Sequence, residues 1–219
     1  MIPVEQFLRP RLAGALPGAE AQRRFAPTPV LEGWAPDLRP DHARRAAALI
    51  LLYPGPHGVT VPLTVRRSDL PHHPGQISLP GGAIDPGETP EAAALRETHE
   101  ELGLDPAGIR LVGPLSTLWV IVSNFVVHPF VAVMDQPPTF SPAADEVAEL
   151  LEVPLDVLLD RTTLRWGRQA LRGRDVDYPH FQVHGHAVWG ATAMILGEFG
   201  SLFDVTFGPP VRSADSISP

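Results

Sequence analysis

Three glutamates stand close together in the stretch GAIDPGETPEAAALRETHEELGL, residues 82 to 104. On a helix, Glu97, Glu100 and Glu101 would share one face, because they are three and four residues apart. Like charges at this spacing repel one another, and a divalent cation would remove the conflict. Ligands that are all oxygen atoms favour a hard ion, so we expect Mg²⁺ or Mn²⁺ at this face.

The surrounding residues predict the helix that must position these carboxylates. Thr89 can cap its N-terminus, and Pro90 suits its first position, where no N–H group is needed. Residues 91 to 102 are mostly good helix formers, and Gly103 can supply the left-handed residue that ends a helix. We expect the adjoining face to pack on a core through Ala94, Leu95, Thr98 and Leu102.

The stretch fits the pattern G-x5-E-x7-R-E-U-x-E-E-x-G-U, where U is an apolar residue, except that Thr98 stands at the first U position. The seven specified identities are Gly82, Glu88, Arg96, Glu97, Glu100, Glu101 and Gly103. This pattern is the Nudix box, and the chain therefore resembles the Nudix hydrolases, which cleave pyrophosphate bonds. An acidic helix face that is merely solvated is the alternative, and the complete pattern argues against it.

The resemblance implies an α/β fold, the Nudix-type α/β/α sandwich with a mixed β-sheet. It also implies metal ligands from Glu97, Glu100 and Glu101, together with the carbonyl oxygen of Gly82. We expect Arg96 to pair with Glu88 or with a ligand glutamate and to fix its orientation. The general base is either Glu97 or a carboxylate outside the box, for which Glu146 is the candidate. A surface charge on a helix is the alternative interpretation of Glu146.

The segment before the box resembles the signature of coenzyme A (CoA) pyrophosphatases. Within LTVRRSDLPHHPGQISLPGG, residues 63 to 82, the matching positions are Leu63, Thr64, Gly75, Gln76, Pro80, Gly81 and Gly82. The resemblance extends to residues 145 to 159 and 186 to 196. Two positions depart from the signature, since Leu79 replaces a phenylalanine and Pro71 replaces an arginine.

The substrate that this resemblance implies is CoA or acyl-CoA, cleaved to 3′,5′-ADP and 4′-phosphopantetheine. Proline cannot bind a phosphate, so Arg66 or Arg67 must replace the missing arginine, with Gln76 as a further substrate contact. If they do not, the substrate is another nucleoside diphosphate derivative, such as a dinucleotide or a nucleotide sugar. A non-catalytic nucleotide-binding module is a third interpretation, although such modules usually lose box glutamates. Trp119, Trp166 and Trp189 are candidates for stacking on adenine, although for Trp189 a position in the core is the favoured interpretation.

The composition limits the other possibilities. A net charge of −8 argues against nucleic-acid binding through bulk electrostatics. All 17 basic residues other than histidine are arginines, so no lysine is present for Schiff-base or general-base chemistry. The chain contains no cysteine and no uninterrupted apolar run of membrane-spanning length, which leads us to expect a cytoplasmic protein without a membrane partner. A homodimer remains compatible with the sequence.

The hydrophobic content of 44% in 219 residues is sufficient for a single Nudix hydrolase domain over residues 1 to 219. Residues 1 to 45 read as a helical and extended N-terminal extension, and 208 to 219 as a disordered tail. Between them we expect strands at 47–53, 59–67, 109–118, 125–134, 166–171 and 181–184, and helices at 91–102, 153–159 and 188–203.

Overall fold

The computed structural model describes residues 2–70, 75–171, 173–205 and 207. The helices in these ranges are α1 (Ile2–Ala13), α2 (Gly18–Arg23), α3 (Pro90–Leu102), α4 (Leu155–Leu159) and α5 (Gly190–Ser201), with short 3₁₀ turns at Pro106–Gly108 and Arg161–Thr163. The strands are β1 (Arg44–Gly55), β2 (Gly58–Arg66), β3 (Ile77–Ser78), β4 (Gly81–Ala83), β5 (Arg110–Pro114), β6 (Leu118–Val120), β7 (Phe125–Val133), β8 (Val147–Pro154), β9 (Leu164–Leu171), β10 (Arg174–Val183) and β11 (His186–Val188).

The larger sheet is mixed. Its central order is β3-β2-β1-β7-β5, and β4, β6 and β8 pair with β1, β7 and β2 respectively. Strands β1 and β7 run parallel, whereas the other pairs in this sheet are antiparallel. A second, antiparallel sheet has the order β11-β10-β9.

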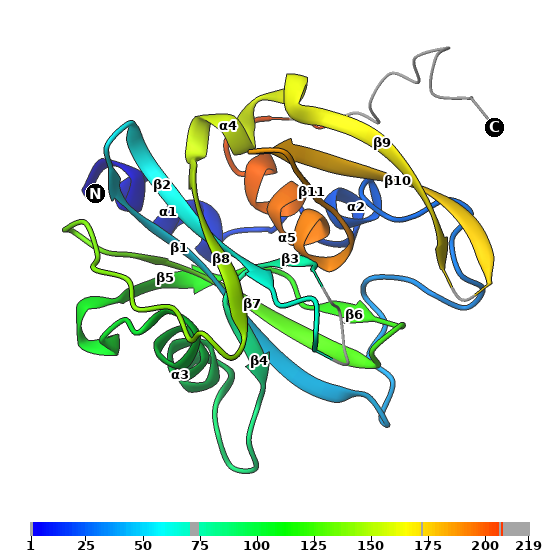
Figure 1. The fold of residues 1–219 in the computed structure, drawn as a ribbon, viewed down its shortest axis with the longest axis horizontal. Coiled ribbons are helices and arrows are strands. Elements are labelled where there is room, and N and C mark those ends of the chain that lie inside the picture. The colour runs from blue at the N-terminus through cyan, green and yellow to red at the C-terminus, as the bar shows by residue number, and fades with distance from the viewer. Residues whose placement is uncertain (1, 71–74, 172, 206, 208–219) are drawn as a thin grey trace.

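Helices cover both faces of the larger sheet (Figure 1). On β1, Leu49 and Leu51 pack in the hydrophobic cluster that contains the buried side of α3. The alternate residues Ile50 and Leu52 pack in the cluster that contains residues of α1 and α5. This burial on both faces explains the continuous run of apolar residues in the sequence of β1. The predicted α/β/α arrangement is confirmed.

Two expectations about the elements need correction. The stretch 109–118 contains the strand β5 and the first residue of β6, because Pro114 ends the first pairing with β7. The short helix predicted from 153 begins only at Leu155, since residues 147–154 form β8 along β2. The N-terminal region contains two helices, with a break after Ala13. The predicted tail, residues 208–219, lies outside the described residues.

Candidate active site

Helix α3 has the ends that its sequence predicts. The hydroxyl of Thr89 accepts a hydrogen bond from the backbone N–H of Ala92 at 3.2 Å. At the other end Gly103 has a φ of 70° and donates its N–H to the carbonyl of His99. Thr98 is fully buried on the core side, where its hydroxyl donates to the carbonyl of Ala94 at 2.7 Å. This bond satisfies the polar atom at a position where the Nudix pattern usually has an apolar side chain.

The three glutamates of this helix differ in burial. The side chain of Glu100 is half-exposed, that of Glu97 is mostly buried, and Glu101 is 8% exposed. Burial raises the pKa of Glu97, and it raises the pKa of Glu101 to about 8, with the charges of Glu97 and Glu146 adding to the effect. Within the described residues, the Oε2 atom of Glu101 has no hydrogen-bond partner. A buried carboxylate with an unpaired oxygen is costly for the fold, which distinguishes it from a solvated acidic face.

Arg96 joins the acidic residues of the box. Its guanidinium donates to both carboxylate oxygens of Glu88 at 3.0 and 3.1 Å, and the Glu88 pKa is lowered as a result. It also donates to Oε1 of Glu97 at 2.7 Å and to Oε2 of Glu100 at 3.0 Å. A further bond at 3.0 Å reaches the carbonyl oxygen of Ala83 in β4. The single arginine therefore fixes two carboxylates of α3 relative to the neighbouring strand.

Strand β4 approaches these carboxylates closely through a glycine. A Cβ atom added at Gly82 would lie 2.5 Å from the carboxylate of Glu97, so a larger residue would displace that side chain. The preceding Gly81 has a φ of 158° and its backbone forms a hydrogen bond with Glu101. The two glycines thus allow the backbone of β4 to approach the carboxylates of α3 closely.

The structure brings Glu146 to the same site. It lies in the turn before β8, not on a helix, so the interpretation as a surface helix charge is wrong. Its Oε2 atom is 3.5 Å from Nη1 of Arg66, and its backbone carbonyl accepts the N–H of Arg67 at 3.0 Å. Because its charge contributes to the raised pKa values of Glu97 and Glu101, Glu146 belongs electrostatically to the cluster.

The predicted substrate-binding residues fall into two groups. Arg66 and Gln76 line a cavity that also reaches Gly82 and Glu101. Arg67 does not line it, and its guanidinium is instead paired with Asp69 at 2.6 and 2.9 Å. The geometry therefore favours Arg66 over Arg67 as the replacement arginine. Pro71 lies outside the described residues.

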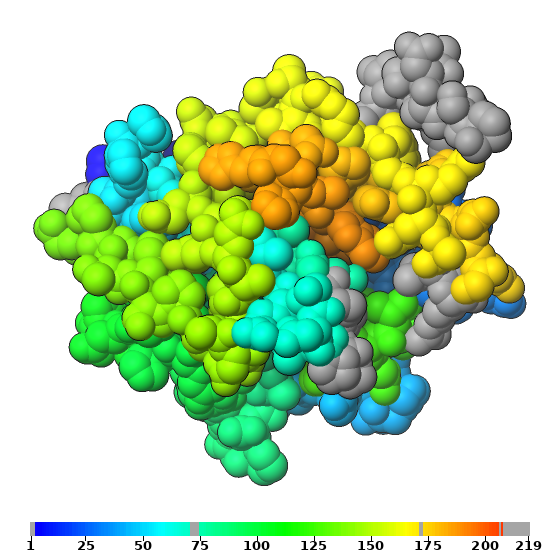
Figure 2. All heavy atoms as spheres, viewed as in Figure 1, coloured from blue at the N-terminus to red at the C-terminus, as the bar shows by residue number. Residues whose placement is uncertain are grey.

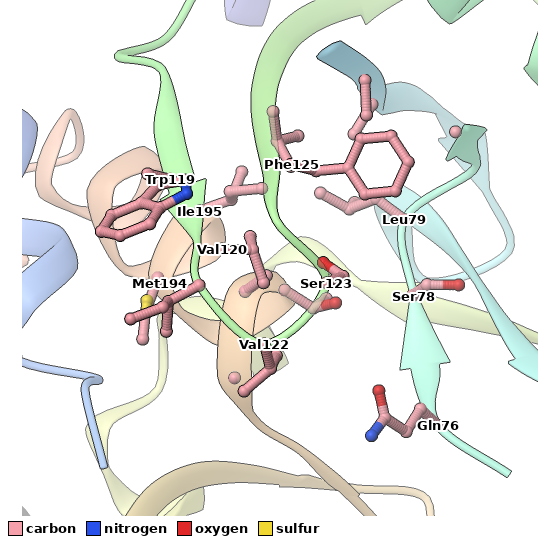
Figure 3. Close-up of a pocket in the computed structure, with 18 of the residues that line it drawn as sticks. Gln76, Ser78, Leu79, Trp119, Val120, Val122, Ser123, Phe125, Met194 and Ile195 are labelled. Atoms are coloured by element: carbon pink, nitrogen blue, oxygen red, sulfur yellow. The ribbon is translucent and has the colours of Figure 1, made fainter. Parts of the chain in front are cut away.

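The cavity itself was not predicted from the sequence. It has a volume of about 490 Å³ and is lined mostly by apolar side chains, several of which are shown in Figure 3. Its walls come from segments far apart in the chain, including residues 26–34, 119–125 and 189–195. Trp119 and Trp189 were noted as stacking candidates, and both line it, whereas Trp166 does not.

The donor set suits a hard divalent cation. Mg²⁺ and Mn²⁺ prefer oxygen ligands. The site offers carboxylates from two parts of the chain, backbone oxygens of β4 and the unpaired oxygen of Glu101. Among the residues that the structure describes, no three acidic or histidine side chains already converge on one point. Arg96 holds one oxygen each of Glu97 and Glu100, so a bound cation would share these carboxylates with the arginine.

Comparison with known proteins identifies the family. The NUDIX domain model matches residues 43–172. The uncharacterized Nudix hydrolase NudL of Pectobacterium atrosepticum is 39% identical over 168 residues, which cover 74% of this chain and 84% of that protein. The peroxisomal coenzyme A diphosphatase NUDT7 of Mus musculus is 38% identical over 113 residues, covering 51% of this chain and 48% of the mouse protein.

A solved structure supports the fold. The crystal structure of RenU, a Nudix hydrolase from M. smegmatis, superposes with a TM-score of 0.51 at 24% identity, covering 81% of this chain and 89% of the other. No helix in the described part of this chain has both the length and the apolar character needed to cross a membrane. From the matched domain, its relatives and the complete box on α3, this chain belongs to the Nudix hydrolase family.

Proposed function

We propose that this protein hydrolyses the diphosphate bond of CoA or acyl-CoA in a metal-dependent reaction. The products are 3′,5′-ADP and 4′-phosphopantetheine, or its acylated form. The observation that carries the proposal is the buried carboxylate of Glu101, which has an unpaired oxygen and lies beside the charges of Glu97 and Glu146. The CoA-type segment at residues 63–82 and the similarity to a CoA diphosphatase support the choice of substrate.

The proposed metal ligands are Glu97, Glu100, Glu101 and the carbonyl oxygen of Gly82. A Mg²⁺ or Mn²⁺ ion bound there would neutralise charge on the diphosphate and lower the pKa of the attacking water. In the protein, Arg96 keeps Glu97 and Glu100 in place through its hydrogen bonds.

The reaction is attack by the oxygen of a water molecule on one phosphorus atom, with cleavage of the bridging P–O bond. Either Glu97 or Glu146 accepts the proton of the water, since both carboxylates belong to the cluster. Arg66, which is 3.5 Å from Glu146 and lines the cavity, is placed to bind the diphosphate or the 3′-phosphate.

Hydrolysis of a different nucleoside diphosphate derivative is the second candidate, because Pro71 stands where CoA pyrophosphatases have an arginine. The test is hydrolysis of CoA, NADH, ADP-ribose and diadenosine polyphosphates with Mg²⁺ and with Mn²⁺, with the products separated by chromatography. We expect CoA to be preferred and 3′,5′-ADP to be released. Preference for NADH or ADP-ribose would support the second candidate, hydrolysis of a different nucleoside diphosphate derivative. If none of the compounds were hydrolysed, a nucleotide-binding module without catalytic activity would be favoured.

A further inference from the structure

The cavity beside the carboxylates is completed by segments outside the matched NUDIX domain. Residues 26–34 precede the matched range 43–172, and residues 189–195 follow it. On α5 the contributing side chains include Met194 and Ile195, which Figure 3 shows near Trp119 and Val120 of β6. This wall is therefore an addition of the flanking chain to the matched domain.

The N-terminal part of the wall is held in place from both ends. We call residues 27–39 the strap. Near its start, Thr28 and Asp177 of β10 exchange backbone hydrogen bonds of 2.7 and 2.8 Å. Further along, the indole nitrogen of Trp34 donates to the carbonyl of Trp119 at 2.8 Å. The strap is thus bonded to β10 and to β6.

The C-terminal part of the wall is similarly fixed. The hydroxyl of Thr192 on α5 donates to the carbonyl of Ile77 in β3 at 3.0 Å. Figure 2 shows the orange atoms of α5 beside the cyan atoms of the β2–β3 region. Helix α5 and strand β3 therefore enclose one end of the cavity together.

Three polar side chains of this wall, Trp34, Trp119 and Thr192, already have hydrogen-bond partners. The indole nitrogens of Trp34 and Trp119 donate to protein oxygens, and the hydroxyl of Thr192 is bonded to β3. What these side chains offer to a ligand is apolar surface. Polar and charged groups such as Arg66, Gln76 and Glu101 belong to the part of the lining that joins the carboxylate cluster.

This division between an apolar wall and a charged end limits what the cavity can bind. A nucleobase or a sugar has several donors and acceptors, each of which loses its hydrogen bonds to water on burial. Against the strap and α5 these groups would find few free partners. An aliphatic chain has no hydrogen bonds to water to lose on entering, and it gains roughly 0.8 kcal/mol for each buried methylene, or about fourfold in affinity.

We propose that this cavity is the specificity subsite for a diphosphate whose second substituent is a long, largely aliphatic chain, and that the strap is its selective wall. The acyl chain of an acylated pantetheine arm has this chemistry, and so does a prenyl chain attached directly to the diphosphate. The inference rests on the proposed function, because it assigns the apolar end of the substrate to a cavity that begins at the proposed catalytic carboxylates.

The first experiment measures kcat/KM for CoA and for its acetyl, butyryl, hexanoyl and octanoyl thioesters with Mg²⁺. We expect kcat/KM to rise with chain length, by up to about fourfold for each methylene that the cavity buries. ADP-ribose and geranyl diphosphate are measured in parallel. ADP-ribose carries a polar second substituent, whereas geranyl diphosphate carries an aliphatic chain and contains no CoA.

Matched variants of the strap test the subsite directly. Leu31 lines the cavity and is partly exposed, whereas Leu38 in the same segment is 41% exposed and does not line it. We expect Leu31→Asp to lower the ratio of kcat/KM for octanoyl-CoA over CoA at least tenfold, and Leu38→Asp to leave this ratio unchanged. Val30→Asp is a second test variant, because Val30 also lines the cavity but is 46% exposed, so the fold should tolerate the charge.

The outcomes separate this inference from the proposed function. The subsite would be overturned, and the CoA activity would stand, if CoA and its thioesters were hydrolysed with the same kcat/KM at every chain length. In that case the ratio of kcat/KM for octanoyl-CoA over CoA would also be equal in the three variants. If geranyl diphosphate alone were hydrolysed, and if Leu31→Asp and Val30→Asp lowered kcat/KM for it, the aliphatic subsite would be supported and the CoA proposal overturned. Preference for ADP-ribose would overturn both.

Discussion

Glu101 combines burial with an oxygen atom that has no hydrogen-bond partner in the described part of the chain, although its helix offers exposed positions for a charge. The fold therefore bears a cost at this residue that a bound cation would remove. We expect Glu101→Gln to lower turnover at least about a hundredfold, because it removes a proposed metal ligand, while the fold is retained. The measurement is kcat together with circular dichroism.

Glu91→Gln is the matched control for this change, since Glu91 lies in the first turn of the same helix and is exposed. Its turnover should stay close to that of the wild type. If Glu101→Gln also retained wild-type turnover, Glu101 would have no part in the reaction.

The raised pKa of Glu101 also predicts how stability depends on pH in the metal-free protein. With a pKa of about 8 in the folded state and an ordinary value of 4.5, the folded state binds more protons than the unfolded state between these pH values. Stability should therefore fall as the pH rises through this window, by up to about 1.4 kcal/mol for each unit of pKa difference.

This pH dependence can be measured as Tm in EDTA from pH 5 to pH 9. The Glu101→Gln variant should show a smaller fall, and Mn²⁺ added at pH 8 should raise the Tm of the wild type. Equal falls in the two proteins would show that Glu101 does not ionise in this range.

At the scale of secondary structure, the site depends on the close approach of β4 to α3. We expect Gly82→Ala to lower turnover at least about tenfold, because the added methyl group must displace the carboxylate of Glu97. Gly108→Ala is the control, since its Cβ would meet only the flexible end of Met134, at 3.4 Å. Both variants are compared by kcat and by Tm. Unchanged turnover in Gly82→Ala would mean that the position of Glu97 is not critical.

The sequence predicted the elements with strong local signals. Helix α3 has a capping residue, a proline at its first position and a terminal glycine, and these interactions act within a few residues of one another. Strand β8 was missed, because its burial comes from pairing with the distant β2, and because Glu149 and Glu152 interrupt its apolar pattern. For the same reason, the sequence did not predict that Glu146 lies in the turn before β8 and not on a helix.

At the scale of the whole molecule, the N-terminal region is joined to the C-terminal helix by a buried carboxylate. Glu198 of α5 is fully buried and accepts hydrogen bonds from the side chain of Gln22 and from the backbone N–H groups of Gly18 and Ser116. We expect Glu198→Ala to lower the free energy of unfolding by about 3 kcal/mol, because it leaves buried donors unpaired.

Chemical denaturation measures this effect, with Glu20→Ala as the control. Glu20 has an 84% exposed side chain and pairs with Arg24 one turn away, so its loss should cost less than about 0.5 kcal/mol. Equal stabilities of the two variants would contradict a bridging role for Glu198.

The sequence could not predict the cavity, which is a property of the complete fold. Its lining includes single residues or short runs from the strap, six strands and α5, and such contacts over long distances leave no periodic pattern. The box could be recognised because its residues are adjacent in the chain. The burial that distinguishes Glu101 from Glu100 depends on β4 and the turn at Glu146, and so it emerged only from the structure.

The measurement that tests the central claim most directly is Mn²⁺ binding, followed by calorimetry or by electron paramagnetic resonance. It compares the wild type with Glu97→Gln and Glu101→Gln in the absence of substrate. We predict saturable binding to the wild type and at least tenfold weaker binding to each variant. Binding of equal strength in all three proteins, or no binding to the wild type, would contradict the assignment of this carboxylate cluster as the metal site.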